Sequence, residues 1–268
     1  MSILEQTPSL VEALKGEMTP KFLATRNSEG KPNVVPVISI LPADDKPDTL
    51  FFGNFLLRKT IQNLQQDTRV GILVITQQLQ GWILKADFQE FQRTGTYVDK
   101  QMSSSLLRYN AYTGIRNAGI IHVRSVQATF SIPKLQVLKD YLLARVARIR
   151  GAAAGNGVMA IPLPVRQEFN KMAAVKVLTW VRDDGYPVVV PALSLQPAGG
   201  QSLICWKGTR LPEPPQGALV AANVLTAEAI SYQVKGRWQR GERTGLIEAE
   251  EFYAGGPPIP GGRLTAGS

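Results

Sequence analysis

Apolar positions along the chain fall mostly into short runs with polar breaks, which predicts many strands and few helices. The runs rich in β-branched and aromatic residues are expected to be buried strands, and they cover residues 22–25, 33–40, 50–52, 70–75, 81–92 and 120–132. Pro36 interrupts one of these runs and cannot donate to a ladder, so we expect a bulge or a sheet edge there.

Apolar spacings of three and four predict helices over residues 7–15, 54–66, 102–116 and 134–150. In the last of these, the stripe of Leu135, Leu138, Leu142, Val146 and Ile149 is expected to face the protein, with arginines facing out. Residues 151–157 are rich in Gly and Ala and are expected to form a flexible joint.

The helix predicted over residues 54–66 carries candidate chemistry. Asn54 is expected to cap it, and Leu57, Ile61 and Leu64 form its apolar face. Arg58 and Lys59 then lie in the first turns, off that face. Free backbone N–H groups and two cations at the start of a helix suit a phosphate group.

The chain contains two similar halves. Residues 22–43 match residues 177–198 without gaps at an offset of 155, and Arg93-Thr94-Gly95 recurs as Arg243-Thr244-Gly245 at an offset of 150. Matches in this number and order indicate two copies of one structural unit.

The pattern of the first half resembles the pyridoxamine 5′-phosphate oxidase-like superfamily of FMN-binding split barrels. The resemblance covers about residues 20 to 95 and is carried by the hairpin at 22–37, the run Leu50-Phe-Phe-Gly-Asn54, the Arg58-Lys59 pair and the strand at 69–74. In that superfamily the barrels pair as homodimers with FMN between the subunits, so a tandem chain resembles a fused homodimer with a pseudo-twofold axis.

The resemblance therefore implies a mainly β (α+β) fold of two tandem split β-barrels with short peripheral helices. We expect a first copy at 1–133, a helical linker at 134–157, a second and degenerate copy at 158–255, and a flexible tail at 256–268.

The two copies differ at the segment that would bind phosphate. The second copy has Pro212, Pro214 and Pro215 where the first has its cationic helix, and these prolines exclude a regular helix. We expect one FMN site with its phosphate end in the first copy and the second copy forming a wall over the ring. A second site using Arg210 is the weaker alternative.

The resemblance assigns cofactor-binding roles to ten residues. Arg58 and Lys59 would bind the phosphate, and Phe52, Gly53 and Asn54 would border the phosphate and ribityl chain. Backbone groups of Val35, Pro36, Val37 and Ser39 would meet the ring edge. Gln80 would touch the ring, or else form a solvated strand end. Catalytic residues are not identified by the sequence.

Other conspicuous residues have structural interpretations. Lys85 and Lys235 recur at matching positions and are interpreted as a shared structural feature. His122, the only histidine, is expected to be an ordinary strand residue. Trp180 and Trp206 are favoured as core residues over flavin-stacking residues. With Cys205 as the only cysteine, expected to be buried, no disulfide or transition-metal cluster is proposed.

Charge and composition limit the classes of binding partner that we expect. The chain has 268 residues and a formal net charge of +9, but its cations are dispersed and no nucleic-acid-binding signature occurs. There is no signal-peptide pattern, and no apolar run approaches the ~20 residues that span a bilayer. A cytoplasmic protein without nucleic-acid or membrane partners is expected.

The leading hypothesis is a flavoprotein that transfers hydride or electrons between FMN and a small-molecule redox substrate. Vitamin B6 oxidation is disfavoured, because the Trp-Gly-Gly run followed by Arg and Pro that is typical of those oxidases is not intact around 261–264. The alternatives are a barrel that binds deazaflavin F420 or haem, and a flavin-binding or structural module without turnover.

Overall fold

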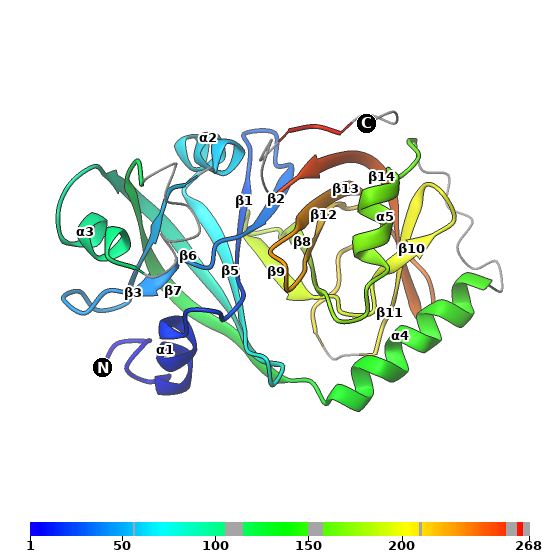
Figure 1. Ribbon diagram of the computed structural model, residues 1–268, viewed down its shortest axis with the longest axis horizontal. Helices are drawn as coiled ribbons and strands as arrows, with labels where there is room; N and C mark the ends of the chain where they lie inside the picture. Colours follow the sequence, from blue (N-terminus) through cyan, green and yellow to red (C-terminus); the bar gives the residue numbers. More distant parts are fainter. Residues whose placement is uncertain (56, 105–114, 150–157, 209–210, 256–261, 265–268) are drawn as a thin grey trace.

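The chain folds into two β-sheet units that lie side by side (Figure 1). The structure is a computed structural model, and it describes residues 1–55, 57–104, 115–149, 158–208, 211–255 and 262–264. All strand pairs within both sheets are antiparallel.

The first sheet has the strand order β2-β1-β5-β6-β7-β4-β3. Its strands are β1 (Lys21–Arg26), β2 (Pro32–Pro36), β3 (Leu41–Pro42), β4 (Thr49–Gly53), β5 (Arg69–Ile75), β6 (Gln80–Gln92) and β7 (Ala118–Ser131). The helices of this copy are α1 (Pro8–Lys15), α2 (Arg58–Gln66) and α3 (Thr96–Met102).

The second sheet has the strand order β9-β8-β12-β13-β14-β11-β10. Each strand in this order occupies the same place as its counterpart in the first sheet, so the second sheet repeats the topology of the first. Its strands are β8 (Val175–Val181), β9 (Pro187–Pro191), β10 (Gln196–Ala198), β11 (Ser202–Trp206), β12 (Leu219–Leu225), β13 (Ser231–Arg240) and β14 (Thr244–Ala254). The helices α4 (Lys134–Ile149) and α5 (Leu163–Phe169) complete the described elements. The predicted fold class, mainly β with two tandem split barrels, is confirmed by this repeated topology.

The two copies pack about a pseudo-twofold axis. Strand β2 lies against β8, β12 and β13, and its counterpart β9 lies against β1, β5 and β6. A single apolar cluster crosses the boundary, with Phe22, Val34 and Leu73 from the first copy packed among residues such as Val177 and Val189 of the second. Such reciprocal contacts are those of an isologous dimer interface, here formed within one chain.

Two buried lysines occupy equivalent positions in the two copies. Lys21 Nζ donates to the carbonyl of Ile38 at 2.9 Å, and Lys176 Nζ donates to the carbonyl of Leu193 at 3.5 Å. Burial lowers the pKa of Lys21 to about 8 and that of Lys176 to about 7. Each lysine ties the start of one strand to the turn that follows the paired edge strand.

The buried Lys176 predicts a pH-dependent stability. Between its folded pKa of about 7 and its ordinary value of 10.5, the unfolded chain binds a proton that the folded chain lacks, so stability should rise with pH. In the Lys176→Met variant, the free energy of unfolding should therefore rise by up to about 1.4 kcal/mol less per pH unit than in the wild type. Urea unfolding at pH 7 and pH 9 measures the difference, with Lys139→Met, at an exposed position, as the control. If the free energy of unfolding changed with pH equally in the wild type and in Lys176→Met, the lowered pKa of Lys176 would be contradicted.

A shared serine contact fixes how the copies align near the candidate site. In the first copy the backbone N–H of Gly53 donates to Ser39 Oγ at 3.2 Å, and in the second the N–H of Trp206 donates to Ser194 Oγ at 3.0 Å. Gly53 therefore corresponds to Trp206, and Asn54 to Lys207.

Two expected elements near the candidate site are shorter than predicted. The strand expected over 33–40 ends at Pro36, and β2 is an edge strand, as the proline predicted. The cap assigned to Asn54 is wrong: α2 begins at Arg58 after Leu57, without a side-chain cap. The N–H of Asn54 instead donates to the carbonyl of Asn117, which prolongs the pairing of β4 with β7.

The apolar stripe of the helix over 134–150 faces solvent, contrary to the prediction. Leu135 and Ile149 are 76% and 75% exposed, and the other three stripe residues are also exposed. The buried residues of α4 are Asp140, Tyr141 and Ala144 on another face. That face packs on β10 and β11, at the outer rim of the second copy (Figure 1).

Several sequence-based expectations lie outside the described residues. They include most of the helix expected at 102–116, of which α3 covers only the start by ending at Met102, the joint at 151–157, Arg210, and most of the tail. The four-part division of the chain stays a prediction. None of the helices in the described ranges has the length and apolar content needed to cross a membrane.

Candidate functional site

A cleft lies where helix α2 of the first copy meets the second copy. From the first copy it is lined by Asn33, Val35, Pro36 and residues 57–60, and from the second by Asn223, Gln233, Tyr253, Ala254 and Gly255. Its empty space is 480 Å³, counting the part open to solvent. We call it the first cleft. Both copies contribute to it, as expected for a site at the interface of two split barrels.

Two buried polar contacts hold α2 against the sheet. Asn33 Nδ2 on β2 donates to Thr60 Oγ1 at 3.3 Å, and Asn63 Nδ2 donates to Thr25 Oγ1 on β1 at 2.9 Å. Thr60, Asn63 and Leu64 form the buried face of the helix, while Ile61, expected on that face, is only half-buried. This packing places the start of α2, with Arg58 and Lys59, at the cleft.

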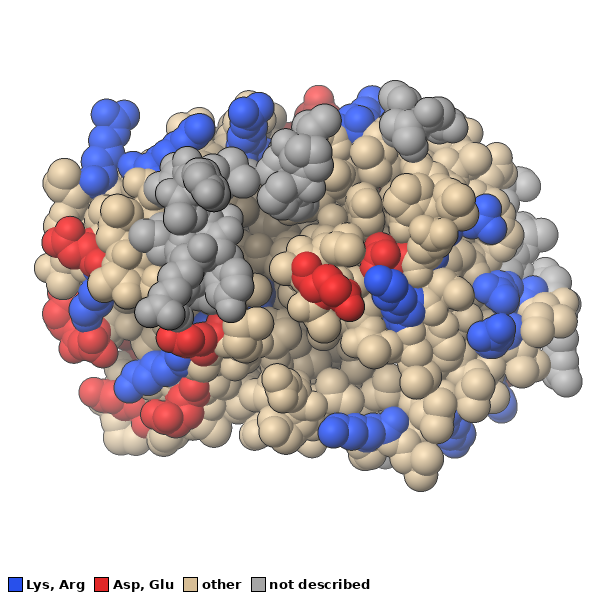
Figure 2. All heavy atoms as spheres, in the orientation of Figure 1, with Lys and Arg blue, Asp and Glu red and all other residues tan. Residues whose placement is uncertain are grey.

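The cationic end of the cleft combines residues of both copies. Lys31, Lys59 and Lys235 line one hollow together with Asn27, Asn63, Glu251 and Tyr253. Lys59 Nζ lies 3.8 Å from the centre of the Tyr253 ring, and Lys235 Nζ lies 5.6 Å from it. Lys235 Nζ also donates to the carbonyl of Pro32 at 2.6 Å. Figure 2 shows Lys and Arg side chains gathered along the edge formed by α2 and the β1–β2 hairpin.

Burial makes this cluster of cations electrostatically costly. It lowers the pKa of Lys59, and it lowers the pKa of Lys235 to about 7 with a further contribution from the charge on Lys59. Burial alone would raise the pKa of Glu251, but the hydrogen bond from Tyr253 and the charges of Lys59 and Lys235 bring it below its ordinary value. Among the described residues that line the hollow, Glu251 is the only carboxylate. A bound anion would therefore relieve repulsion that the protein itself leaves unbalanced.

The predicted site residues are distributed unevenly around this cleft. Four of them line it: Val35, Pro36, Arg58 and Lys59. Five others are buried in the first copy and are not among its lining residues: Val37, Ser39, Phe52, Gly53 and Asn54. Gln80 is exposed at the start of β6 and is not among the residues that line either hollow. The cofactor roles of all ten residues remain predictions.

The second-copy residues of the cleft were missed by sequence reasoning. Only Lys235 had a signal, because it recurs with Lys85. Both lysines reach the hairpin of the other copy: Lys85 Nζ donates to Asp184 Oδ2 at 2.8 Å and lies 3.8 Å from the Tyr186 ring centre. Their shared position is thus an interface contact, and Lys235 lines the cationic hollow in addition.

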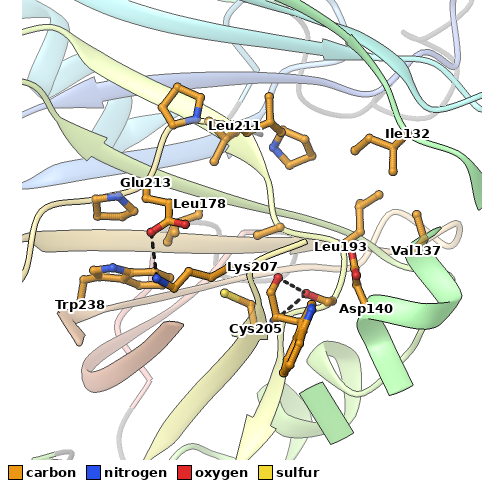
Figure 3. Close-up of a pocket in the computed structure, with 17 residues that line it drawn as sticks. Ile132, Val137, Asp140, Leu178, Leu193, Cys205, Lys207, Leu211, Glu213 and Trp238 are labelled. Atoms are coloured by element: carbon orange, nitrogen blue, oxygen red, sulfur yellow. Dashed lines mark hydrogen bonds and ion pairs between the residues drawn. The ribbon is translucent and has the colours of Figure 1, made fainter. Parts of the chain in front are cut away.

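The pseudo-symmetric counterpart of this region in the second copy is a separate pocket (Figure 3). Its empty space is 630 Å³, counting the part open to solvent. The counterparts of seven predicted FMN contacts line it: Val190, Pro191, Ala192, Ser194, Cys205, Trp206 and Lys207. Trp206 therefore borders a pocket, whereas Trp180 is buried in the core as expected. We call this pocket the second cleft.

The surroundings of His122 and Cys205 are those of structural residues in the described part of the chain. His122 is a half-buried strand residue of β7, aligned with Thr49 and Asp87 on the neighbouring strands. Burial raises the pKa of the Cys205 thiol to about 12, so this cysteine stays protonated. Among the residues that the structure describes, no three His, Cys, Asp or Glu side chains are placed to share a metal ion.

Comparisons with known proteins give similar structures but no similar sequences. Neither the protein-family models nor the curated proteins contain a match to this chain. Among solved structures, HupZ of Group A Streptococcus shares 22% identity over 48% of this chain and 94% of its own, with a TM-score of 0.37. An FMN-binding protein of Syntrophomonas wolfei shares 15% identity over 49% of this chain and 88% of its own, with a TM-score of 0.39. The haem storage protein HutZ of Vibrio cholerae shares 15% identity over 49% of this chain and 95% of its own, with a TM-score of 0.35.

Each of these structures corresponds to about half of the chain, the length of one copy. The repeated strand order described above fixes the architecture independently of them. The fold is a seven-stranded antiparallel split β-barrel unit that is present twice. Function has to be argued from the clefts.

Proposed function

We propose that the first cleft binds FMN and that the protein uses the bound flavin in an oxidation–reduction reaction with a small molecule. The observation that carries this proposal is the cluster of the half-buried Lys59 and the buried Lys235 beside Arg58 at the start of α2. A phosphate dianion supplies the negative charge that this cluster lacks, and the uncapped N–H groups of α2 are further donors for it.

The residues present fit a flavin mononucleotide by their chemistry. Arg58, Lys59 and Lys235 would hold the phosphate, and the edge strand at Val35 and Pro36 would line the ring. Gln233 and Asn223 of the second copy supply amide groups on the opposite side of the cleft. When bound, the isoalloxazine ring supplies the hydride and electron chemistry, and the chain binds it, orients it and shields it from water.

The protein's own side chains near the cleft are suited to binding more than to proton transfer. Burial and the hydrogen bond to Glu251 raise the pKa of Tyr253 above its usual range, so its hydroxyl remains a donor at neutral pH. We further propose a cytoplasmic protein that acts on a small redox substrate, without nucleic-acid or membrane partners and with the pseudo-dimer as its functional unit.

Titration of the purified protein with FMN and riboflavin tests the proposal. FMN should bind at least about tenfold more tightly than riboflavin, since one charge-assisted contact contributes ~1.5–3 kcal/mol. Flavin absorbance and fluorescence quenching give both affinities. Equal affinities, or no flavin binding, would refute the proposal. A Soret band in the purified protein would identify haem instead, and selective binding of F420 would identify the deazaflavin.

A further inference from the structure

The second cleft keeps the walls of a split-barrel cofactor site but has lost its phosphate-binding end. By the alignment of Gly53 with Trp206, the positions of Arg58 and Lys59 are taken by Leu211 and Pro212. Both replacements line the pocket. An aliphatic side chain and a proline ring thus stand where the first copy presents two cations.

The charges that remain at the second cleft are already paired or are negative. Lys207 Nζ lies 3.1 Å from Glu213 Oε2, and the same carboxylate is 3.5 Å from Arg240 Nε. Figure 3 shows the Lys207–Glu213 contact at the pocket wall. Asp140 of α4 adds a second carboxylate. A phosphate or carboxylate ligand would therefore meet no unpaired cation among the described lining residues.

Among the described residues, one buried polar group at this pocket has no hydrogen-bond partner, and a second, a buried carboxylate, accepts one hydrogen bond. Asp140 is 5% exposed, and the one hydrogen bond to its carboxylate within the described part of the chain comes from Gln136 Nε2 at 2.7 Å. The indole N–H of Trp238, a residue only 1% exposed, has no partner among the described residues. In Figure 3 Asp140 and Trp238 stand at opposite ends of the pocket. Buried polar groups without partners are rare in proteins and point to a ligand or water that completes them.

The surface between these two ends is apolar. Leu178, Leu193, Leu211 and Val137 surround the space in Figure 3, and Val190 and Pro191 of the edge strand β9 complete the wall. A ligand enclosed here gains from burying an apolar body.

We propose that the second cleft is a binding site for an apolar molecule that lacks an anionic group and carries an amine or amide N–H donor for Asp140. The site is distinct from the first cleft, so its occupant and FMN bind the same chain at the same time. The two copies thereby select ligands of different charge through one backbone framework.

Three naphthalene probes with the same ring and different groups test this proposal on the full chain: 2-naphthylmethylamine, 2-naphthalenemethanol and 2-naphthoate. Calorimetric titration should give affinities in the order amine, alcohol, carboxylate, with the amine at least about tenfold tighter than the carboxylate. Asp140→Asn should weaken the amine about tenfold and leave the alcohol nearly unchanged, which a general loss of folding would not do.

A gain-of-function variant provides the second arm. Leu211→Arg combined with Pro212→Lys restores the two cations of the first copy and should reverse the order, so that 2-naphthoate becomes the tightest probe. Leu142→Arg, on the exposed face of α4, adds a similar charge outside the pocket and should change nothing.

The proposal is overturned if none of the probes binds at millimolar concentration, if 2-naphthoate binds the wild type as tightly as the amine, or if FMN binds in a 2:1 ratio and competes with the probes. Lys59→Met, which lies in the first cleft, should leave probe binding intact. If FMN did not bind but the probes did, the proposed function would be refuted and the proposed ligand site in the second cleft would stand.

Discussion

Lys59→Met should weaken FMN binding by about 10- to 100-fold while leaving the affinity for riboflavin nearly unchanged. Lys59 lines both the apolar and the cationic part of the first cleft, as does Tyr253. The loss of one charge-assisted hydrogen bond to a phosphate corresponds to ~1.5–3 kcal/mol. Methionine is an uncharged side chain of similar length, so the variant removes mainly the ammonium charge that lies over the Tyr253 ring.

Fluorescence titrations with both flavins measure this effect, and Lys85→Met is the matched control. Lys85 is the counterpart of Lys235, and it makes a similar contact to the other copy without lining the first cleft. Arg58→Ala should likewise reduce FMN affinity far more than Arg210→Ala. A parallel loss for FMN and riboflavin would mean that Lys59 supports the fold of the cleft and not the phosphate.

Gly71→Ala should destabilise the protein by about 3 kcal/mol, at the upper end of the cost of overpacking a well-packed interior. Gly71 lies on β5, where the second copy's edge strand approaches. A Cβ at this position would lie 2.3 Å from the carbonyl oxygen of Pro187 and 3.0 Å from its carbonyl carbon. Both are backbone atoms, so relief requires the two copies to move apart.

Urea unfolding monitored by tryptophan fluorescence measures this loss. Gly200→Ala adds the same single carbon at a glycine with no atom within 4 Å of the added carbon, and should leave the free energy of unfolding within about 0.5 kcal/mol of wild type. A Gly71→Ala protein as stable as wild type would show that the copies are less tightly opposed at β5 and β9 than described here.

Features encoded by local sequence were predicted correctly. Most of the strand runs and the edge position of Pro36 depend on a few neighbouring residues. The cationic start of α2 was found for the same reason, since Arg58 and Lys59 are adjacent in the chain. The tandem fold followed because the internal repeat is visible without any structural information.

The errors concern choices made by distant parts of the chain. The N–H of Asn54 pairs with Asn117 of the segment before β7, a contact that sequence spacing does not reveal, and the helix starts four residues later. For α4, the apolar stripe gives a period but does not identify the surface on which the helix packs, and the opposite face docks through Tyr141 and Ala144. The second-copy half of the first cleft, including Tyr253, depends on how the two sheets are juxtaposed.

The tandem linkage has a consequence for how such a protein can change. In a symmetric dimer of identical subunits, one codon alters two surfaces, so a substitution that improves one cleft is imposed on the other. Here position 71 is glycine while its counterpart, Ala221, carries a methyl group, and each can vary alone. With both barrels in one chain, each pair of equivalent positions can hold two different residues across the same interface. One cleft can therefore change its side chains while the other keeps its own.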